Sequence, residues 1–384
     1  MMTCQKHLFN LDEDIHYLNG SYMSPLLKST VSAGMTGMLL KSSPNNVTMQ
    51  HFLADVEVLR GLFARLINVP VAERVAIIPS VSYGMAVVAK NIKVNRGQNI
   101  VLADAQFPSN VYPWCELAKE KEMHIKTVAY PNTKTSGSDW TENLLAAIDS
   151  DTALVALAHV HWANGIKYDL EKIGARAREV GALFVLDGTQ CVGALTMDVE
   201  KIKPDALICG GYKWLMGPYT LGYAYFNERF DNAKPLEENW INRKGSEDFT
   251  QLVNYRDEYQ PFARRFDMGE RSNFINVPMG IAAITQILEW GTENIQTYLK
   301  NLTEPYLEKL RNAGCIIEKV PFTAHHLIGI GLPKNVNAVA LSEKLKERKI
   351  FVSVRGEFVR LSPHVYNDDN DMAIFTETVL GFGL

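Results

Sequence analysis

Cysteine is scarce in the sequence, and no two cysteines lie close together. The five that occur in 384 residues are Cys4, Cys115, Cys191, Cys209 and Cys315. An odd number of scattered cysteines argues against a disulfide framework, and the lack of a CxxC pair argues against a zinc ribbon. This use of cysteine is typical of the reducing cytoplasm, which is the location that we expect.

The sequence also lacks an excess of positive charge and long hydrophobic runs. Lys and Arg number 39 against 43 Asp and Glu, and the formal net charge is -4. Without a basic field, we expect no binding to nucleic acid. No apolar run approaches the length that spans a bilayer, and the opening residues MMTCQKHLFNLDEDIHYL lack the apolar core of a signal peptide. We therefore expect neither a membrane span nor a signal peptide.

What the sequence does contain is an ordinary globular composition, with 47% hydrophobic and 21% charged residues, and an alternation of strand and helix patterns. Short apolar runs predict strands buried on both faces. These runs are Val75–Ile78, Ile100–Ala103, Ala153–Ala158, Leu183–Leu186, Ala206–Cys209 and Tyr223–Phe226. Between two of them lies a helical pattern with Asp169 as its N-cap and Gly181 at its C-terminal end. This spacing predicts a mainly parallel, helix-covered sheet with ligands at the carboxyl ends of its strands.

A second, smaller α/β unit is predicted toward the C-terminus. After roughly Tyr255 the pattern changes to a long helix, from Val277 to about Trp290, followed by further helices and short strands. A chain of this length is expected to form two or three compact units. We predict a large domain over residues 15–255 and a small domain formed by residues 1–14 and 256–384.

The strongest chemical signal is a pair of motifs, VLDGTQ at residues 185–190 and ICGGYKWLMGP at residues 208–218. Asp187 ends one predicted strand, and Lys213 follows the end of another. An enzyme that uses pyridoxal 5'-phosphate (PLP) needs a lysine amine for the Schiff base and a carboxylate beside the pyridine nitrogen. A surface lysine and a turn aspartate are the alternatives for each residue alone. Together with Gln190 and Tyr212, the two residues indicate a PLP site.

With these motifs the chain resembles the class V aminotransferase family, which includes cysteine desulfurases, kynureninase and isopenicillin N epimerase-like proteins. The resemblance extends from YLNGSYMSP at residues 17–25 to VRLSPHVYN at residues 359–367. It implies an α/β fold of the PLP-dependent transferase type (the aspartate aminotransferase fold, fold type I) and PLP as the cofactor. It also implies a homodimer with active sites at the subunit interface.

The resemblance further implies roles for residues around the cofactor ring. Lys213 is expected to form the Schiff base, and Asp187 to pair with the pyridine nitrogen. Gln190 matches the residue that donates a hydrogen bond to the phenolic oxygen of the cofactor. Phe107, in QFPSNVYPW, matches the group that stacks on the ring, and its alternative is a core phenylalanine.

A further group of residues is expected at the cofactor phosphate. PSVSYGMAVVA, at residues 79–89, resembles the phosphate-binding turn, so Val81 and Ser82 would lie at the N-terminus of a helix that favours a dianion. Ser82 is expected to open that helix, and a capping role alone is its alternative. Tyr212 matches a kynureninase-like phosphate ligand. Trp240 in ENWINR and Ser272 in RFDMGERSNF match segments from the partner subunit, and for Trp240 a buried core position is the alternative.

Substrate contacts are expected from a different set of residues. Arg360 matches the family arginine that binds the α-carboxylate, a task suited to the planar guanidinium; a structural ion pair is its alternative. Arg355 is left with two interpretations, contact with a distal substrate group or ordering of its loop. Asn19 is expected to line the entrance and Asn273 to reach the neighbouring site.

The segment AHVHWANG raises the question of a metal. His159 and His161 lie two residues apart and would share one face of a strand end, but no third ligand is apparent in the sequence. We expect His159 or Trp162 to contact the ring or the substrate, and we expect no metal. NDDND, at residues 367–371, lacks the glycine and glutamate of a calcium loop and is predicted to cap the last helix.

The reaction itself is open among several outcomes at the amino-acid Cα. In the cysteine desulfurases of the family that the chain resembles, a nucleophilic cysteine lies on a longer loop before the carboxylate arginine. Residues 355–360 contain neither that loop nor a cysteine, and this departure argues against desulfuration by persulfide transfer. Our prediction is an amino-acid transaminase, with a PLP-dependent lyase (kynureninase-like or selenocysteine/cysteine lyase-like) or an epimerase as the alternative. A non-catalytic PLP-fold binding protein is a further alternative. Such a role normally comes with an attached DNA-binding or partner module, and we expect none in this sequence.

Overall fold

A seven-stranded sheet forms the centre of the computed structural model, which describes residues 2–131, 133 and 136–383. In spatial order its strands are β2 (Val75–Ile78), β8 (Gly222–Phe226), β7 (Ala206–Gly210), β6 (Leu183–Asp187), β5 (Thr152–Ala158), β3 (Asn99–Ala103) and β4 (His124–Val128). Strand β8 runs antiparallel to β2 and β7 on its two sides, and all the other neighbouring pairs are parallel. The predicted mainly parallel sheet is confirmed, with β4 as an additional edge strand.

Helices cover both faces of this sheet, because its strands direct apolar side chains alternately into two cores. Along β5, Val155 and Leu157 join one hydrophobic core, whereas Leu154 and Ala156 join the other. Side chains of α5 (Ser136–Ala147) and α6 (Leu170–Val180) belong to the first core. Those of α3 (Val81–Asn91) and α4 (Tyr112–Lys121) belong to the second. The sheet is therefore the middle layer of three.

Helix α6 shows how local chemistry sets the ends of an element. The Asp169 side chain accepts a hydrogen bond from Lys172 N, which satisfies one of the free amides of the first turn. At the other end Gly181 takes a φ of 79°, a left-handed conformation that glycine adopts without steric cost. Both predicted caps are confirmed.

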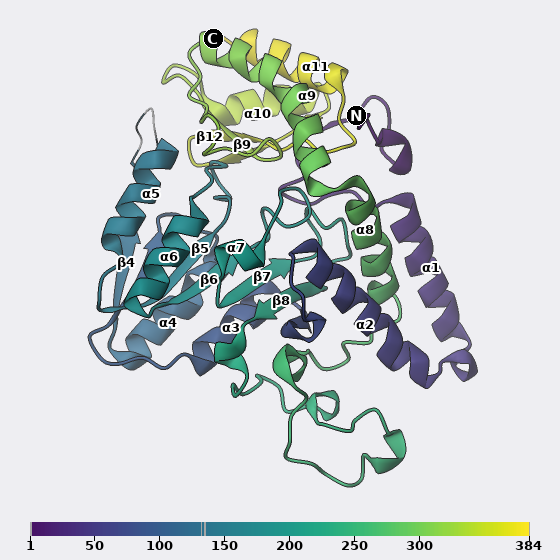
Figure 1. The fold of residues 1–384 in the computed structure, drawn as a ribbon. Helices are drawn as coiled ribbons and strands as arrows, with labels where there is room; N and C mark the ends of the chain where they lie inside the picture. Colours follow the sequence, from purple (N-terminus) through teal and green to yellow (C-terminus); the bar gives the residue numbers. More distant parts are fainter. Residues whose placement is uncertain (1, 132, 134–135, 384) are drawn as a thin grey trace.

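The C-terminal part of the chain forms a second α/β layer above the large sheet (Figure 1). Strands β11 (Ser353–Arg355), β12 (Phe358–Leu361) and β9 (Ile328–Gly331) make an antiparallel sheet in the order β11-β12-β9. Helices α9 (Thr292–Asn312), α10 (Ala338–Glu347) and α11 (Asp369–Leu380) lie beside it. The N-terminal strand β1 (His16–Tyr17) pairs with β10 (Ile350–Phe351), so the start of the chain reaches this layer.

The remaining helices lie along one side of the large sheet. Helix α8 (Asn276–Trp290) packs against both α1 (Lys28–Ser42) and α2 (Met49–Leu66), and the short α7 (Val199–Ile202) packs on α6. Between β8 and α8 the chain forms 3-10 turns, among them Trp240–Asn242 and Phe249–Gln251, in a lobe that projects from the molecule in Figure 1.

A buried ion cluster holds the end of this lobe against α2. The Arg60 side chain is fully buried, and its Nη2 lies 2.8 Å from Asp267 Oδ2. Arg271 Nη1 lies 2.7 Å from the same oxygen, and Asp267 Oδ1 accepts a hydrogen bond of 2.8 Å from Ile77 N on β2. Burial alone would lower the pKa of Arg60, but Asp267 and Glu57 outweigh it and raise that pKa. The cluster therefore joins α2, β2 and the segment that leads into α8.

Candidate active site

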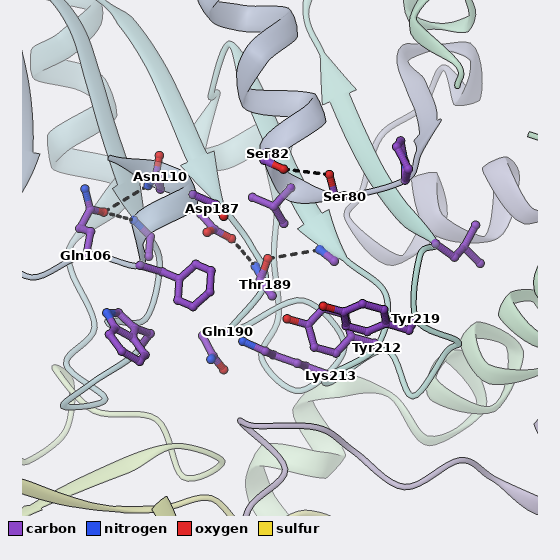
Figure 2. A pocket seen from close by; sticks show the side chains of 18 of the residues that line it. Ser80, Ser82, Gln106, Asn110, Asp187, Thr189, Gln190, Tyr212, Lys213 and Tyr219 are labelled. Atoms are coloured by element: carbon purple, nitrogen blue, oxygen red, sulfur yellow. Dashed lines mark hydrogen bonds between the residues drawn. The ribbon is translucent and has the colours of Figure 1, made fainter. Parts of the chain in front are cut away.

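A cavity of about 320 Å³ opens at the carboxyl ends of the central strands, where the sequence places the ligand. Figure 2 shows Lys213, Gln190 and Tyr212 on one side of it, with Asp187 and Thr189 facing them. The predicted site residues that line this cavity are Val81, Ser82, Phe107, Trp162, Asp187, Gln190, Tyr212 and Lys213. They come from the ends of β6 and β7, the start of α3, and the loops after β3 and β5. One fold therefore brings together residues that are up to 132 positions apart in the sequence.

Lys213 is a buried amine in a turn that only small residues permit. A Cβ on Gly211 would lie 2.5 Å from Leu221 O, which is closer than real Cβ contacts. The Lys213 Nζ lies 5.4 Å from the Phe107 ring centroid and 5.5 Å from that of Tyr212. Burial lowers the pKa of Lys213 to about 8, although Asp187 acts in the opposite direction. A part of the lysine is therefore a neutral amine at neutral pH.

Asp187 is the carboxylate that faces this amine. It stands at the last position of β6, is buried, and its Oδ1 accepts a hydrogen bond of 2.9 Å from Thr189 N. Burial raises the pKa of Asp187, while Thr189 and Lys213 act against that shift. A buried carboxylate of this kind gains most from a cationic or hydrogen-bonding partner.

Gln190 is fixed by a residue that the sequence interpretation did not single out. Trp214 Nε1 donates a hydrogen bond of 2.9 Å to Gln190 Oε1, and Gln190 Nε2 donates one of 3.1 Å to Ser21 O. Trp214 is fully buried, and its ring lies edge-to-face with His326 at 4.7 Å. The position of Trp214 directly after the lysine is the one signal that could have indicated a role for it. Its contact sets which way the Gln190 amide points.

The N-terminus of α3 borders the same cavity, with one correction to the prediction. Ser80, not Ser82, is the N-cap: its backbone is extended and its side chain accepts a hydrogen bond of 3.2 Å from Tyr83 N. Ser82 lies in the first turn, with its Oγ 3.0 Å from Ser80 Oγ. Val81 and Ser82 still line the cavity, so the free amides of the first turn are beside it.

Two rings form a wall of the cavity. Phe107 and Trp162 meet edge-to-face with their centroids 5.5 Å apart, and Phe107 is 38% exposed, so it is no core phenylalanine. Trp162 Nε1 donates a hydrogen bond of 2.7 Å to Ala105 O, which fixes the indole. His161 lies beside them in the cavity lining, and burial lowers its pKa to about 4, so it is neutral at physiological pH.

His159 lies elsewhere, in contrast to the prediction. It lines a different cavity, together with Lys167 and Tyr168, and its Nδ1 is buried without a hydrogen-bond partner. Strand β5 ends at Ala158, so the two-residue alternation of a strand does not continue through the histidines. His161 therefore takes the position that was expected for His159.

Arg360 lies next to the aromatic wall, on the side of the C-terminal layer, and Asn19 contacts that layer. Arg360 is 2% exposed, and its Nη1 donates a hydrogen bond of 2.8 Å to Trp162 O. Burial lowers the pKa of Arg360 to about 9, with a further contribution from Arg355, so the guanidinium is still charged at neutral pH. Asn19 Oδ1 accepts a hydrogen bond of 2.7 Å from Ser353 Oγ. Arg360 forms no ion pair with the described residues, in contrast to the structural alternative.

Trp240, Ser272 and Asn273 are not in the Lys213 cavity of their own chain. They line a second cavity of about 360 Å³ near the projecting lobe. Trp240 is 39% exposed, which excludes the core alternative. Ser272 Oγ donates to Phe52 O, and Asn273 Oδ1 accepts from Ile275 N and Asn276 N at the start of α8.

The described residues also bear on other functional classes. In the parts of the chain that the structure describes, no three His, Cys, Asp or Glu side chains converge as metal ligands would. None of the described helices combines the length and the apolar character of a membrane span. Asp368 accepts a hydrogen bond of 3.1 Å from Asp371 N, so NDDND caps α11 as predicted.

Comparison with known proteins places these observations in a family. The chain matches the family model "Aminotransferase class-V" over residues 33–372. It is 26% identical to the "uncharacterized aminotransferase YcbU" of Bacillus subtilis, over 83% of this chain and 82% of that one. It is 28% identical to a "probable cysteine desulfurase" of Pyrococcus abyssi, over 95% and 93% of the two chains.

The solved structures agree in fold. A mutant of C-DES with glycine covalently linked to its PLP cofactor superimposes with a TM-score of 0.88 at 20% identity, covering 99% of this chain and 100% of that one. The cysteine desulfurase of Thermococcus onnurineus gives 0.82 at 21% identity, over 99% and 98%. Because the family model spans most of the chain and the fold agrees, this protein belongs to the class V aminotransferase family of PLP-dependent, fold type I enzymes.

Proposed function

We propose that the chain uses PLP in the Lys213 cavity to act at the Cα of an amino acid, and that the reaction is a transamination. The observation that carries the proposal is the buried, partly neutral Lys213 amine opposite the buried Asp187 carboxyl, in a cavity bordered by the first turn of a helix. The three groups supply three different kinds of contact to one ligand.

The side chains present fit the cofactor. Lys213 would hold it through its amine, Asp187 would pair with its ring nitrogen, and the first turn of α3 would bind its phosphate. Two of these groups are incompletely satisfied by the protein itself: burial raises the pKa of Asp187, and the Val81 and Ser82 amides at the start of α3 have no intrahelical partner. When bound, PLP supplies an electron-accepting ring that stabilises negative charge at the substrate Cα.

The protein would contribute proton transfer and orientation. Among the described residues, Lys213 is the one amine that lines the cavity, and in its neutral form it can remove the Cα proton. Arg360 would bind the substrate carboxylate with a two-donor fork and so set the direction of the Cα–H bond. Phe107 and Trp162 form one side of the cavity and give it an apolar surface.

Transamination is favoured because it needs a single proton carrier. Lys213 can remove the Cα proton and deliver it again nearby. A lyase that expels a poor leaving group needs a second acid. His161 is neutral, and its two ring nitrogens lie 3.0 Å from Asn164 Oδ1 and 3.1 Å from Asp104 O, so it is poorly placed for that task.

A lyase is the second candidate, because several curated relatives are named cysteine desulfurases. Transfer of sulfur to a protein cysteine has little support here. Cys191 and Cys209 are buried with raised pKa values, and no described cysteine lines the Lys213 cavity. A thiol with a raised pKa is a poor nucleophile, because the thiolate is the reactive form.

The experiment that separates the two candidates mixes the PLP-loaded protein with single amino acids in the absence of any 2-oxo acid. For a transaminase, we expect one equivalent of 2-oxo acid per active site and loss of the visible cofactor band. Turnover then continues only after a 2-oxo acid acceptor is added. Many equivalents of product without an acceptor would identify a lyase instead.

The pKa of Lys213 leads to a prediction for cofactor uptake. The neutral amine is the nucleophile, and below about pH 8 its fraction rises about tenfold per pH unit. We therefore expect the rate of PLP attachment to the apoprotein to rise steeply up to about pH 8 and to level off above it. Stopped-flow absorbance measures this rate. A rate that keeps rising beyond pH 9, as for an unperturbed lysine, would contradict the lowered pKa.

The homodimer is part of the same proposal. Trp240, Ser272 and Asn273 line a cavity of their own, so their expected contribution to an active site requires a second subunit. Beside this cavity α1 exposes Met38 and Leu39, at 52% and 70%, as a buried interface would require. Equilibrium ultracentrifugation of the PLP-loaded protein measures the oligomeric state, and a monomer would contradict the shared site.

A further inference from the structure

Two arginines occupy the same face of one short hairpin. In the register of β11 and β12, Ser353 pairs with Arg360 and Arg355 pairs with Phe358. Side chains of directly paired residues lie on the same face, and so do those two positions apart on one strand. Arg355 and Arg360 therefore project from the same side of the hairpin.

That side of the hairpin faces the aromatic wall of the active site. The Arg355 Cζ lies 5.6 Å and the Arg360 Cζ lies 6.0 Å from the Trp162 ring centroid. The indole is held in place by its hydrogen bond to Ala105 O, and the Trp162 carbonyl accepts from Arg360. The hydrogen bond therefore holds Arg360 in place relative to the cavity that Trp162 lines, and Arg355 lies over the same indole.

Neither arginine has a carboxylate partner among the described residues. Arg355 Nη1 donates a hydrogen bond of 2.7 Å to the carbonyl oxygen of the adjacent Val354, and Arg360 Nε is buried without a hydrogen-bond partner. Each guanidinium carries five donors, so most of this capacity is unused. Arg360 is buried, and a buried charge in a folded protein is normally paired. Arg355 is partly exposed, and a second cation beside Arg360 without an anion is unfavourable.

The charge on this side exceeds what one carboxylate would neutralise. Burial is the largest cause of the lowered pKa of Arg360, and the charge of Arg355 is the second. Both arginines also act to lower the pKa of Lys213. A substrate that carries a single carboxylate would leave one cation uncompensated. A substrate with a second acidic group would compensate both.

We infer that Arg355 binds a second anionic group of the substrate, so that the enzyme accepts amino acids with an acidic side chain, such as dicarboxylic amino acids. The inference rests on the proposed function, because it takes Arg360 as the ligand of the α-carboxylate. It selects between the two interpretations of Arg355 that the sequence left open. An arginine that only orders its loop would not need to lie over the indole of the active site.

The experiment uses acids that bind but cannot react. Succinate and glutarate are dicarboxylates without an amino group, and butyrate is a monocarboxylate of similar length. Their dissociation constants for the PLP-loaded enzyme are measured by calorimetry at constant ionic strength. We expect the better dicarboxylate to bind about tenfold to a hundredfold more tightly than butyrate, as for one additional charge-assisted hydrogen-bonded contact.

Two variants assign the effect. Arg355→Gln is expected to abolish the preference for the dicarboxylate and to leave the affinity for butyrate within about twofold. Arg96→Gln removes an arginine whose side chain is 80% exposed and remote from the hairpin, and it is expected to retain the full preference. Equal affinities in the wild type, or an undiminished preference in Arg355→Gln, would overturn the inference.

The outcome is separable from the test of the proposed function. Binding of an unreactive acid does not depend on whether the enzyme is a transaminase or a lyase. If amino acids react but dicarboxylates show no advantage, the inference about Arg355 fails while the proposed function stands. If dicarboxylates bind as expected but no amino acid reacts, the proposed function fails while the anion site stands.

Discussion

Replacement of Lys213 by alanine is expected to lower the turnover rate with every amino acid by at least about a thousandfold, because it removes the only amine that the described residues contribute to the cavity lining. The same substitution removes the covalent attachment of the cofactor, so we also expect the visible spectrum to be that of free PLP. Initial rates and absorbance spectra of the purified variant measure both effects. The buried, partly neutral state of this lysine is the physical reason for so large a loss.

Two further variants show that the effect belongs to this amine. Lys213→Arg keeps a positive charge but cannot provide a neutral nitrogen, so it is expected to be as inactive as Lys213→Ala. Lys167 is another partly buried lysine with a lowered pKa, but it lines a different cavity. Lys167→Ala should therefore retain activity within a few-fold. Undiminished turnover in Lys213→Ala would refute the assignment.

Replacement of Asp267 by alanine is expected to lower the free energy of unfolding by about 3–5 kcal/mol, the usual cost of breaking a buried ion pair from one side. The side chain is 1% exposed and contacts both Arg60 and Arg271. Without it, Arg60 remains fully buried next to β2 with only the partly exposed Glu57 as a counterion, and the amide of Ile77 loses its acceptor. Denaturant unfolding at fixed protein and PLP concentration measures the change.

Glu57→Gln is the matched control for the ion cluster. Glu57 contacts the same two arginines, but its side chain is 37% exposed. Exposed pairs contribute little because water screens them, so we expect a loss of no more than about 1 kcal/mol. Equal losses in the two variants would mean that burial of Asp267 is not what gives the cluster its stability.

The sequence was sufficient for the layers of the large sheet and for most of the Lys213 cavity. Buried parallel strands appear as short apolar runs, and all six predicted runs overlap strands of the sheet. Strand β4 was missed because HIKTV lies at the edge, where its side chains are only partly buried and the run is not apolar. Asp187 and Lys213 could be predicted because each lies in a short local motif at the end of a strand, and the two strands, β6 and β7, are consecutive.

The other features depend on contacts between distant parts of the chain. Asp267 lies 207 positions from Arg60, and nothing in either segment indicates the partner. Trp214 acts through Gln190, so a role for it follows only from the hydrogen bond between them. His161 lines the cavity instead of His159 because β5 ends at Ala158, and strand ends are poorly defined by sequence patterns.

In the proposed mechanism, the hairpin of β11 and β12 holds the two arginines that bind the substrate, and the groups that hold the cofactor lie elsewhere in the chain. Every proposed contact with the cofactor within the chain comes from residues 81–213, whereas the two arginines lie in one stretch of six residues near the C-terminus. We therefore expect that exchange of Arg355 alone changes the side-chain preference, with Arg360, the lysine, the carboxylate and the helix terminus left unchanged. The division makes the hairpin the natural starting point for redesigning which amino acids the enzyme accepts.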